Sequence, residues 1–436
     1  MKNHPLFNLL NQSEYPVGIY SACTANPLVL EACMEKALQT NSPLLIEATA
    51  NQVDHHGGYT GMTPKDFYQF IESLAKKHSL SMNQIVLGGD HLGPLTFAHL
   101  PESEAMEEAK TVVRDYVLAG FTKIHIDTSM KLLDDPEYLT DDIIASRGAI
   151  LAQVAEEAYQ TLLKSNPQAI HPVYIVGSEV PIPGGAQATT SELQVTRPED
   201  FKATLNSFKT HFENLGLQKS WQYVIAIVVQ PGIEEKDSGC TDYNPSKAVA
   251  LMSALRDENS LVFEGHSSDY QTKEALRQLV QDGVRILKVG PGLTFALREA
   301  LFSLAHIEKE IFHHQLEKQS HFIEALDDEM LKSPKYWEKY YHGTDSEIAL
   351  KRKYSFSDRC RYYLPTEPMQ KAQEKLIQNL AQSEIPLNLL SQFMPIQYRK
   401  VRQKVLANHP LALIKDYIGL TIDDYLDATM QTKLMK

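Results

Sequence analysis

Eight short apolar runs, each ending in small or polar residues, are the feature of this sequence that most constrains its fold. The stretch between consecutive runs is always long enough for a helix. Uninterrupted valine, isoleucine and leucine residues indicate strands that are buried on both faces, as in a parallel sheet. The runs are VGIYSACTA (17–25), PLLIEATA (43–50), QIVLGGDH (84–91), TKIHIDTS (122–129), PVYIVGSE (172–179), YVIAIVVQPG (223–232), LVFEGHSS (261–268) and RILKVGPG (285–292).

The segments between the runs have the pattern of amphipathic helices, as at residues 26–38, 64–78 and 106–119. Thr63–Pro64 reads as a helix N-cap followed by proline at the first helical position. Eight strand–helix units over residues 10–310 predict an α/β fold, a TIM (β/α)8 barrel. The alternative is an open doubly wound sheet, but no GxGxxG pattern follows the first run.

The apolar runs stop after about residue 310, and only helical segments follow. Neither a repeat of solenoid period nor a low-complexity linker occurs there. We therefore expect two parts, a TIM barrel over residues 1–310 and a helical extension over residues 311–436 that packs on the barrel.

Charge and cysteine content restrict the partners and the compartment. The chain has 436 residues and a net charge of −13, which disfavours nucleic acid because its phosphates would be repelled. Its four cysteines are scattered and form no CxxC pair, as is typical of a reducing compartment. Residues 1–16 are too polar for a signal peptide, and no apolar run is long enough for a membrane span. These features predict a cytoplasmic protein without nucleic-acid or membrane partners.

The candidate functional residues are the polar side chains at the ends of the runs, because TIM-barrel active sites form where the strands end. Alternation puts Lys123, His125 and Asp127 on one face of a strand, and Glu264 and His266 on one face of another. Charged groups that point into a barrel must pair with one another or bind a ligand. The candidates are Glu47, Asp90, His91, His125, Asp127, Glu179, Gln230, Glu264, His266 and Lys288.

Two interpretations of these residues are open. They could form a polar plug of salt bridges and hydrogen-bonded histidines, which is the commoner role of any one buried histidine. Alternatively, His91, Glu179 and His266, at three strand ends, could bind a divalent metal. Imidazole and carboxylate ligands suit Zn²⁺, Mn²⁺ or Co²⁺. Their joint occurrence favours the metal site, although the spacing matches no fixed motif.

The eighth run suggests a phosphate site, because its glycines end a strand and open a helix. Backbone N–H groups and the helix dipole suit an anion there, in a segment that contains Gly290, Gly292 and Thr294. Ser267 and Ser268 of the preceding run could contribute. The alternative is that the glycines only allow a tight turn.

Two further pairs of residues have weaker patterns. Arg359 and Arg361, in YSFSDRCRYY (354–363), could bind a phosphate or a partner, or form a surface ion pair with Asp358. His55–His56, before two glycines, could belong to a loop over the pocket, although a solvated turn is the simpler interpretation.

Several long stretches resemble the GatZ/KbaZ/AgaZ family, the Z subunits of class II D-tagatose-1,6-bisphosphate aldolase. The resemblance extends over nearly the whole chain. It is carried by LIEATANQVDHHGGYTGMTPKDF, LGGDHLGP, KIHIDTSM, GSEVPIPGGA, IAIVVQPG, HSSDYQT, KVGPGLTFALREA and YSFSDRCRYY.

This resemblance implies a TIM barrel and a subunit that supports a separate catalytic Y subunit in tagatose, galactitol or N-acetylgalactosamine catabolism. Some members are instead described as metal-dependent epimerases that interconvert fructose 6-phosphate and tagatose 6-phosphate at C4. An older kinase name for the family finds no GxxxxGK[ST] motif in this chain.

The resemblance also implies roles for individual residues. Class II aldolases place an Asp–His pair after a barrel strand, in which the aspartate moves a proton and the histidine binds the metal. GGDH matches this pair at Asp90 and His91, and FEGHSS is similar to a later metal-histidine segment at His266. Where an aldolase has a third histidine, this chain has Gln230, so Glu179 or Gln230 would complete the metal site.

The implied chemistry is retro-aldol cleavage between C3 and C4, or C4 epimerisation by cleavage and re-formation of that bond. Asp90 or Asp127 is the expected proton-transfer group, with Glu264 as a further catalytic carboxylate. A Schiff base through Lys288 or Lys123 is the rival mechanism. The residues expected to bind substrate are Glu47, His125, Ser267, Ser268, Lys288, Gly290, Gly292, Thr294, Arg359 and Arg361.

We therefore expect a Z-type aldolase subunit with a Zn²⁺, Mn²⁺ or Co²⁺ site for ketohexose phosphates, which forms oligomers and acts with an aldolase Y subunit. The alternative is a stand-alone metal-dependent 4-epimerase. The set of strand-end residues favours a working site over a pure scaffold.

Overall fold

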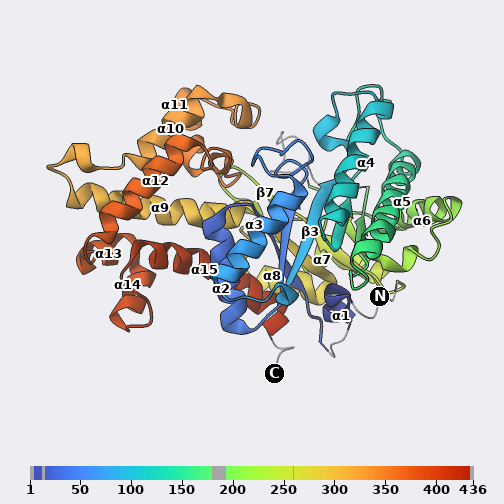
Figure 1. Ribbon diagram of the computed structural model, residues 1–436, viewed down its shortest axis with the longest axis horizontal. Helices are drawn as coiled ribbons and strands as arrows, with labels where there is room; N and C mark the ends of the chain where they lie inside the picture. The colour runs from blue at the N-terminus through green and yellow to red at the C-terminus, as the bar shows by residue number, and fades with distance from the viewer. Residues whose placement is uncertain (1–3, 12–14, 179–192, 259, 433–436) are drawn as a thin grey trace.

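The computed structural model describes residues 4–11, 15–178, 193–258 and 260–432. Eight parallel strands form a closed barrel, which confirms the predicted TIM barrel (Figure 1). They pair in chain order, and the last pairs with the first. The strands are β1 (Ile19–Cys23), β2 (Leu44–Thr49), β3 (Ile85–Leu92), β4 (Lys123–Ile126), β5 (Val173–Val176), β6 (Val224–Val229), β9 (Val262–Gly265) and β10 (Val284–Val289). After β6, β7 (Glu234–Glu235) and β8 (Cys240–Thr241) form a short antiparallel pair.

The interior of the barrel changes from apolar to charged along the strand direction. At the amino-terminal end, residues such as Val86 and Ile286 pack against Leu6 and Leu10 of α1 (Pro5–Asn11). Toward the carboxyl end the inward side chains of Glu47, Asp90, Glu264 and Lys288 are charged and buried, and the side chain of Lys123, the first residue of β4, reaches Glu47 and Glu264. The buried charges are therefore concentrated at the end of the barrel where TIM barrels bind their ligands.

Helices follow every strand and cover the outside of the barrel. The α3 helix begins at the predicted N-cap, where the Thr63 hydroxyl accepts from Asp66 N and Asp66 bonds back to Thr63 N. The barrel helices are α2 (Pro27–Thr40), α3 (Pro64–Lys77), α4 (Glu102–Leu118), α5 (Asp141–Ser165), α6 (Pro198–Asn214), α7 (Pro245–Leu255), α8 (Lys273–Asp282) and α9 (Pro291–Ile311).

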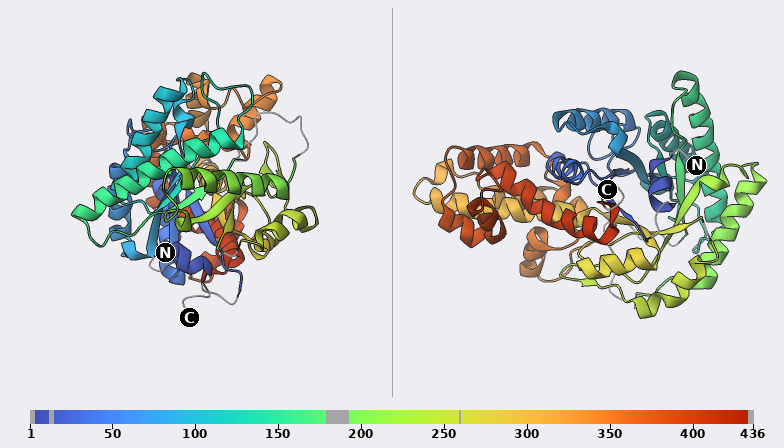
Figure 2. Two further views of the ribbon diagram at one scale, coloured as in Figure 1. Left: turned by 90° about the vertical axis from the view of Figure 1, so that its right-hand side faces the viewer. Right: turned by 90° about the horizontal axis from the view of Figure 1, so that it is seen from below.

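The C-terminal extension lies on one side of the barrel (Figure 2). Its helices are α10 (Phe322–Lys332), α11 (Asp345–Tyr354), α12 (Glu367–Ala381), α13 (Leu387–Phe393), α14 (Pro395–Arg402) and α15 (Pro410–Thr429). The last of them, α15, returns to pack against α2, α8 and α9.

Beyond α15, the Gln431 side chain accepts from Tyr20 N and donates to Pro43 O. These bonds tie the end of the extension to the first two strands. Because α15 packs against three barrel helices, it is part of the helical layer around the barrel.

None of the helices in the described ranges is both long enough and apolar enough to cross a membrane.

Acidification should destabilise the fold through His4, which lies at the amino-terminal end of the barrel. Its Nε2 lies 2.9 Å from Thr122 O, and its Nδ1 accepts from Leu6 N at 3.2 Å. Burial lowers the pKa of His4 from 6.5 to about 4, and it outweighs the hydrogen bond to Thr122 O, which favours the charged ring. The unfolded chain therefore binds the extra proton first, and stability present above pH 6.5 is lost as the pH falls toward 4. Urea unfolding at pH 7 and pH 4.5 should show a loss about 2 kcal/mol larger for the wild type than for His4→Gln; equal losses would contradict this role.

Candidate functional site

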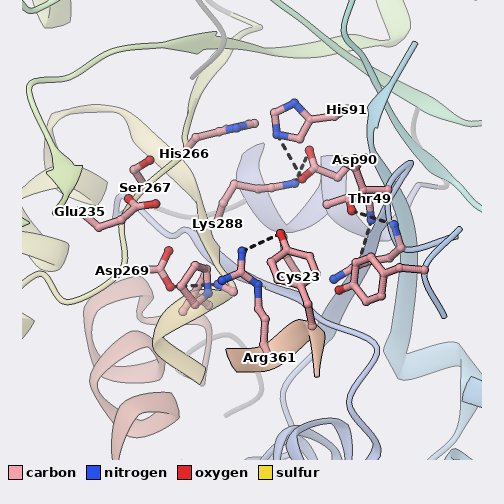
Figure 3. A pocket seen from close by; sticks show the side chains of 17 residues that line it. Cys23, Thr49, Asp90, His91, Glu235, His266, Ser267, Asp269, Lys288 and Arg361 are labelled. Carbon is pink, nitrogen blue, oxygen red and sulfur yellow. Dashed lines mark hydrogen bonds and ion pairs between the residues drawn. The ribbon is translucent and has the colours of Figure 1, made fainter. Parts of the chain in front are cut away.

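A pocket opens at the carboxyl end of the barrel. Its wall is formed by strand ends, by the loop after β2 and by residues of the C-terminal extension. Figure 3 shows Asp90, His91 and His266 on one side, Arg361 and Asp269 on the other, and Lys288 between them. The lining residues are Cys23, Thr49, Asn51, Gln52, Tyr59, Asp90, His91, Glu235, His266, Ser267, Asp269, Lys288, Val289, Gly290, Pro291, Arg361 and Tyr362.

Below the pocket, two lysines and three carboxylates form a buried ionic network. Lys123 Nζ lies 2.8 Å from Glu47 and 2.7 Å from Glu264, and these three side chains are fully buried. Lys288 Nζ lies 2.7 Å from Glu47 and 2.7 Å from Asp90. Three carboxylates against two ammonium groups leave one negative charge in excess, so the network can accommodate a further cation.

His125 connects this network to a set of groups that could hold a metal ion. Its Nδ1 lies 2.8 Å from Asp90 Oδ1, and its buried Nε2 has no hydrogen-bond partner among the described residues. Ligand atoms of Asp90, His125, Glu264 and His266 all lie within 4.8 Å of one another. Two imidazoles and two carboxylates, with a buried imidazole nitrogen left unpaired, are a donor set that fits a divalent transition metal.

His91 lies beside this set but makes a different contact. Its Nδ1 lies 2.8 Å from Asp127 Oδ2, while its Nε2 lies 3.6 Å from Asp90 Oδ2. The His91 ring packs against the His125 and His266 rings, with centroids 5.2 and 4.9 Å away. His91 has a φ of +50°, a left-handed conformation that is uncommon for a residue other than glycine and that occurs at functional sites.

Burial and neighbouring charges give the two buried histidines that line the pocket, His91 and His266, different protonation states. Burial lowers the pKa of His266 to about 4, so its ring is neutral and can offer a lone pair. Burial has the same effect on His91, but Asp90 and Asp127 outweigh it and raise the pKa of His91. Burial opposes ionisation of Asp127 as well, but the hydrogen bond from His91 lowers the pKa of Asp127 to about 2.

The predicted metal ligands are therefore only partly brought together. His266 lies in the cluster, whereas His91 pairs with Asp127, and Glu179 lies outside the described residues. Gln230 does not line the pocket, because its Oε1 accepts from Gly232 N and Ile233 N in its own turn. In its place the structure brings His125, Asp90 and Glu264, which the sequence pattern assigned to catalysis or substrate binding, into the ligand set.

The predicted phosphate loop already binds a carboxylate of the chain. Asp269 Oδ1 accepts from Gly290 N at 3.0 Å and from Gly292 N at 2.7 Å, at the N-terminus of α9. Ser268 is buried and donates to Lys288 O, and Thr294 donates to Asp358. The prediction that these residues bind phosphate is therefore not supported, because their donors have internal partners. Ser267 lines the pocket.

The two arginines of the extension have different positions. Arg361 lines the pocket, and its guanidinium donates to Ser357 O and Asp358 O and to the Tyr362 hydroxyl. Arg359 instead packs over the Tyr340 ring, 3.3 Å from its centroid. Only Arg361 is thus placed to meet an anionic ligand at the pocket.

Several residues of the pocket wall were not among the predicted site residues, including Tyr59, Asn51, Gln52, Glu235 and Tyr362. Asn51 and Gln52 lie two and three residues beyond the end of β2, and Tyr362 follows Arg361, so closeness to a strand end or to a predicted site residue was an available signal. Glu235 lies in the short β7–β8 pair, and no apolar run in the sequence predicts this pair.

Known proteins share the sequence pattern and the fold of this chain. The family described as D-tagatose-1,6-bisphosphate aldolase subunit GatZ/KbaZ-like matches residues 7–430. A solved structure from Sinorhizobium meliloti 1021, described as a probable tagatose 6-phosphate kinase, is 42% identical with a TM-score of 0.86. The match covers 94% of this chain and 100% of that chain.

Two aldolases are far more distant. The YdjI aldolase from Escherichia coli K12 is 12% identical with a TM-score of 0.39, over 80% of this chain and 90% of that one. The fructose-bisphosphate aldolase from Campylobacter jejuni is 14% identical with a TM-score of 0.42, over 84% and 88%. These two matches are too distant to bear on function. The match from residue 7 to residue 430 shows that the chain belongs to the GatZ/KbaZ-like family of D-tagatose-1,6-bisphosphate aldolase subunits.

Proposed function

We propose that this chain is a Z-type aldolase subunit whose barrel mouth binds a divalent metal and a ketohexose phosphate. The observation that carries the proposal is the joint presence, in one pocket region, of a buried metal-ligating cluster and a guanidinium. Asp90, His125, Glu264 and His266 form the cluster, and Arg361 stands across the pocket from His266 and Asp90. A pure scaffold has no need of this arrangement, because apolar side chains could fill the barrel mouth without the cost of burying charges.

The cluster residues would hold Zn²⁺, Mn²⁺ or Co²⁺. The ion would supply Lewis acidity, polarising the carbonyl oxygen of a ketose. Two properties of the cluster favour a bound cation. The His266 ring is neutral. Burial opposes ionisation of Glu264, but Lys123 and Lys288 outweigh it and hold the pKa of Glu264 well below its usual range.

Proton transfer is assigned to the row formed by Asp127, His91 and Asp90. Asp90 Oδ1 is taken by His125 and Lys288, whereas Asp90 Oδ2 faces His91 Nε2. Asp127 holds the other side of the His91 ring. A proton on His91 is therefore stabilised by Asp127 on one side and by Asp90 Oδ2 on the other, so His91 can act as a general acid–base at a sugar hydroxyl while Asp90 stays ionised.

A Schiff base through Lys288 is disfavoured. Although burial favours the neutral amine, Asp90 and the other carboxylates outweigh it and raise the pKa of Lys288 well above its usual range. An ammonium group has no lone pair to attack a carbonyl, so Lys288 would instead orient and neutralise carboxylates. The chain also lacks the GxxxxGK[ST] motif of P-loop kinases.

Arg361 should determine affinity for the phosphate group. Charge-assisted hydrogen bonds contribute about 1.5–3 kcal/mol, so Arg361→Met should weaken binding of tagatose 6-phosphate by about 10–100-fold. Binding of unphosphorylated tagatose should not change, and this comparison separates phosphate recognition from damage to the pocket. Calorimetric titration of both sugars measures the effect; equal weakening for the two sugars would contradict a phosphate contact.

The proposal is tested by reconstitution with an aldolase Y subunit, the partner that the family relationship supports. Cleavage of tagatose 1,6-bisphosphate to triose phosphates is measured for the Y subunit alone, with this chain, and with its His266→Asn variant, in Zn²⁺ or Mn²⁺ and after EDTA. We expect the wild-type chain to raise the rate, and His266→Asn to raise it less.

The matched control is His99→Asn, which changes an exposed histidine away from the pocket. Equal stimulation by all three forms would show a scaffold with an unused site. Metal-dependent conversion of fructose 6-phosphate to tagatose 6-phosphate by this chain alone would identify a 4-epimerase instead.

A further inference from the structure

A second group of metal-ligating side chains lies outside the pocket, where the loop after β2 meets α4. His55 Nε2 lies 2.5 Å from Glu108 Oε2, and His56 Nε2 lies 3.2 Å from the same oxygen. One ligand atom from each of the three residues lies within 4.8 Å of the other two. The Nε2 atoms of two consecutive histidines therefore point at one carboxylate oxygen, which belongs to Glu108 of α4.

The loop is built so that the two imidazoles stay together. The Asp54 carboxylate accepts from His56 N at 2.7 Å and from Gly58 N at 2.9 Å, which closes the turn. Gly58 has a φ of +55°, and a Cβ there would lie 2.4 Å from Gln52 O, so only glycine allows this path. The turn therefore holds the rings 3.9 Å apart, centroid to centroid.

The surroundings favour a cation. Phe97 packs against both rings, at 5.7 and 6.1 Å between centroids, and limits their rotation. The Asp115 carboxyl group of α4 also interacts electrostatically with His55. Arg114, on the same helix, is a second basic neighbour of Asp115. Two imidazoles and one carboxylate are a common ligand set of Zn²⁺ with a fourth position left for water.

The distances are close to those that an ion needs. Tetrahedral Zn²⁺ with bonds near 2.1 Å separates its ligand atoms by about 3.4 Å, close to the 3.2 Å between His56 Nε2 and Glu108 Oε2. His55 Nε2 would retreat by less than about 1 Å.

We propose that His55, His56 and Glu108 form a Zn²⁺ site that attaches the loop after β2 to α4. This loop carries Asn51, Gln52 and Tyr59, which line the pocket. An ion bound here would fix one wall of the pocket without touching the ligand in it. The site is distinct from the cluster at the barrel mouth and shares no residue with it.

The test is the zinc content of the full chain after removal of metal with EDTA and equilibrium dialysis against micromolar free Zn²⁺. We expect His56→Ala and Glu108→Gln each to bind one Zn²⁺ per chain fewer than the wild type. The His56 side chain is 63% exposed, so its removal leaves the core intact. His99→Ala, which removes another exposed histidine outside the cluster, should bind as much as the wild type. Wild-type zinc content in both His56→Ala and Glu108→Gln would overturn the proposal.

The two sites are separated by adding His266→Asn. If both sites bind Zn²⁺, His56→Ala and His266→Asn lose different ions and the double variant loses both. If the mouth binds none, the wild type binds one ion and His56→Ala none.

Attachment of the loop is measured by limited proteolysis: Zn²⁺ should slow cleavage within residues 50–62 in the wild type but not in His56→Ala. Cleavage unaffected by Zn²⁺ in the wild type would overturn that part.

Discussion

Replacement of Lys123 by methionine should lower the free energy of unfolding by about 3–5 kcal/mol. The Lys123 side chain is fully buried and lies within 2.8 Å of Glu47 and 2.7 Å of Glu264, which are buried too. Methionine fills most of the same volume, so the loss comes from two carboxylates deprived of their shared ammonium group. Urea unfolding followed by circular dichroism measures the effect.

The control is Lys110→Met, because Lys110 pairs with the exposed Glu107 on the surface of α4. Such a pair contributes at most about 1 kcal/mol, so this variant should unfold almost like the wild type. Adding Glu47→Gln and Glu264→Gln to Lys123→Met should recover much of the loss, because neutral amides need no counter-charge. A triple variant less stable than Lys123→Met would show that packing, not charge, explains the effect.

Removal of His125 should weaken metal binding at the barrel mouth on the order of 100-fold, more than loss of a residue that only orients a ligand. Its Nε2 is buried and lacks a hydrogen-bond partner among the described residues, and one of its ring nitrogens lies within 4.8 Å of ligand atoms of Asp90, Glu264 and His266. Titration of EDTA-treated His125→Ala with Zn²⁺, with a chelating dye as competitor, measures the affinity. The titration is best done in the His56→Ala background, which removes the proposed loop site.

His91→Ala is the informative comparison, because the resemblance to class II aldolases assigned the metal to His91, whereas its Nδ1 pairs with Asp127 here. We expect His91→Ala to reduce affinity about 10-fold, as a neighbour of the ligands would. The reverse order of effects would return His91 to the ligand set and assign His125 to orientation of Asp90. A thermal melt of each variant checks that the barrel remains folded.

The barrel could be predicted from sequence because its signals are local. A run such as VIAIVV in β6 is buried along its whole length, and a cap such as Thr63 depends only on residues of its own helix. The alternation that put Lys123 and His125 on one face is equally local, and both residues point into the barrel. The position of the candidate site followed from the strand ends, because closure brings those ends together.

The contacts inside the site could not be predicted in this way. Glycines at the start of α9 indicate an anion site, but the Asp269 carboxyl group, which the loop after β9 supplies, already accepts their N–H groups. Gln230 follows its strand as a ligand would, yet its own turn takes its side chain. In both cases a group of the chain competes for the position that a ligand was expected to occupy.

By itself, then, the sequence determined the eight strand–helix units, the family and the set of polar residues at the barrel mouth. Those features depend on periodicity and on neighbours within a few residues of each other. Only the tertiary structure decided that His125 rather than His91 joins Asp90, Glu264 and His266 in one cluster, that Arg361 reaches the pocket from the extension, and that α15 completes the helical layer. Each of these outcomes is a choice among partners far apart in the chain, and such a choice is made by packing and charge pairing after the barrel has closed.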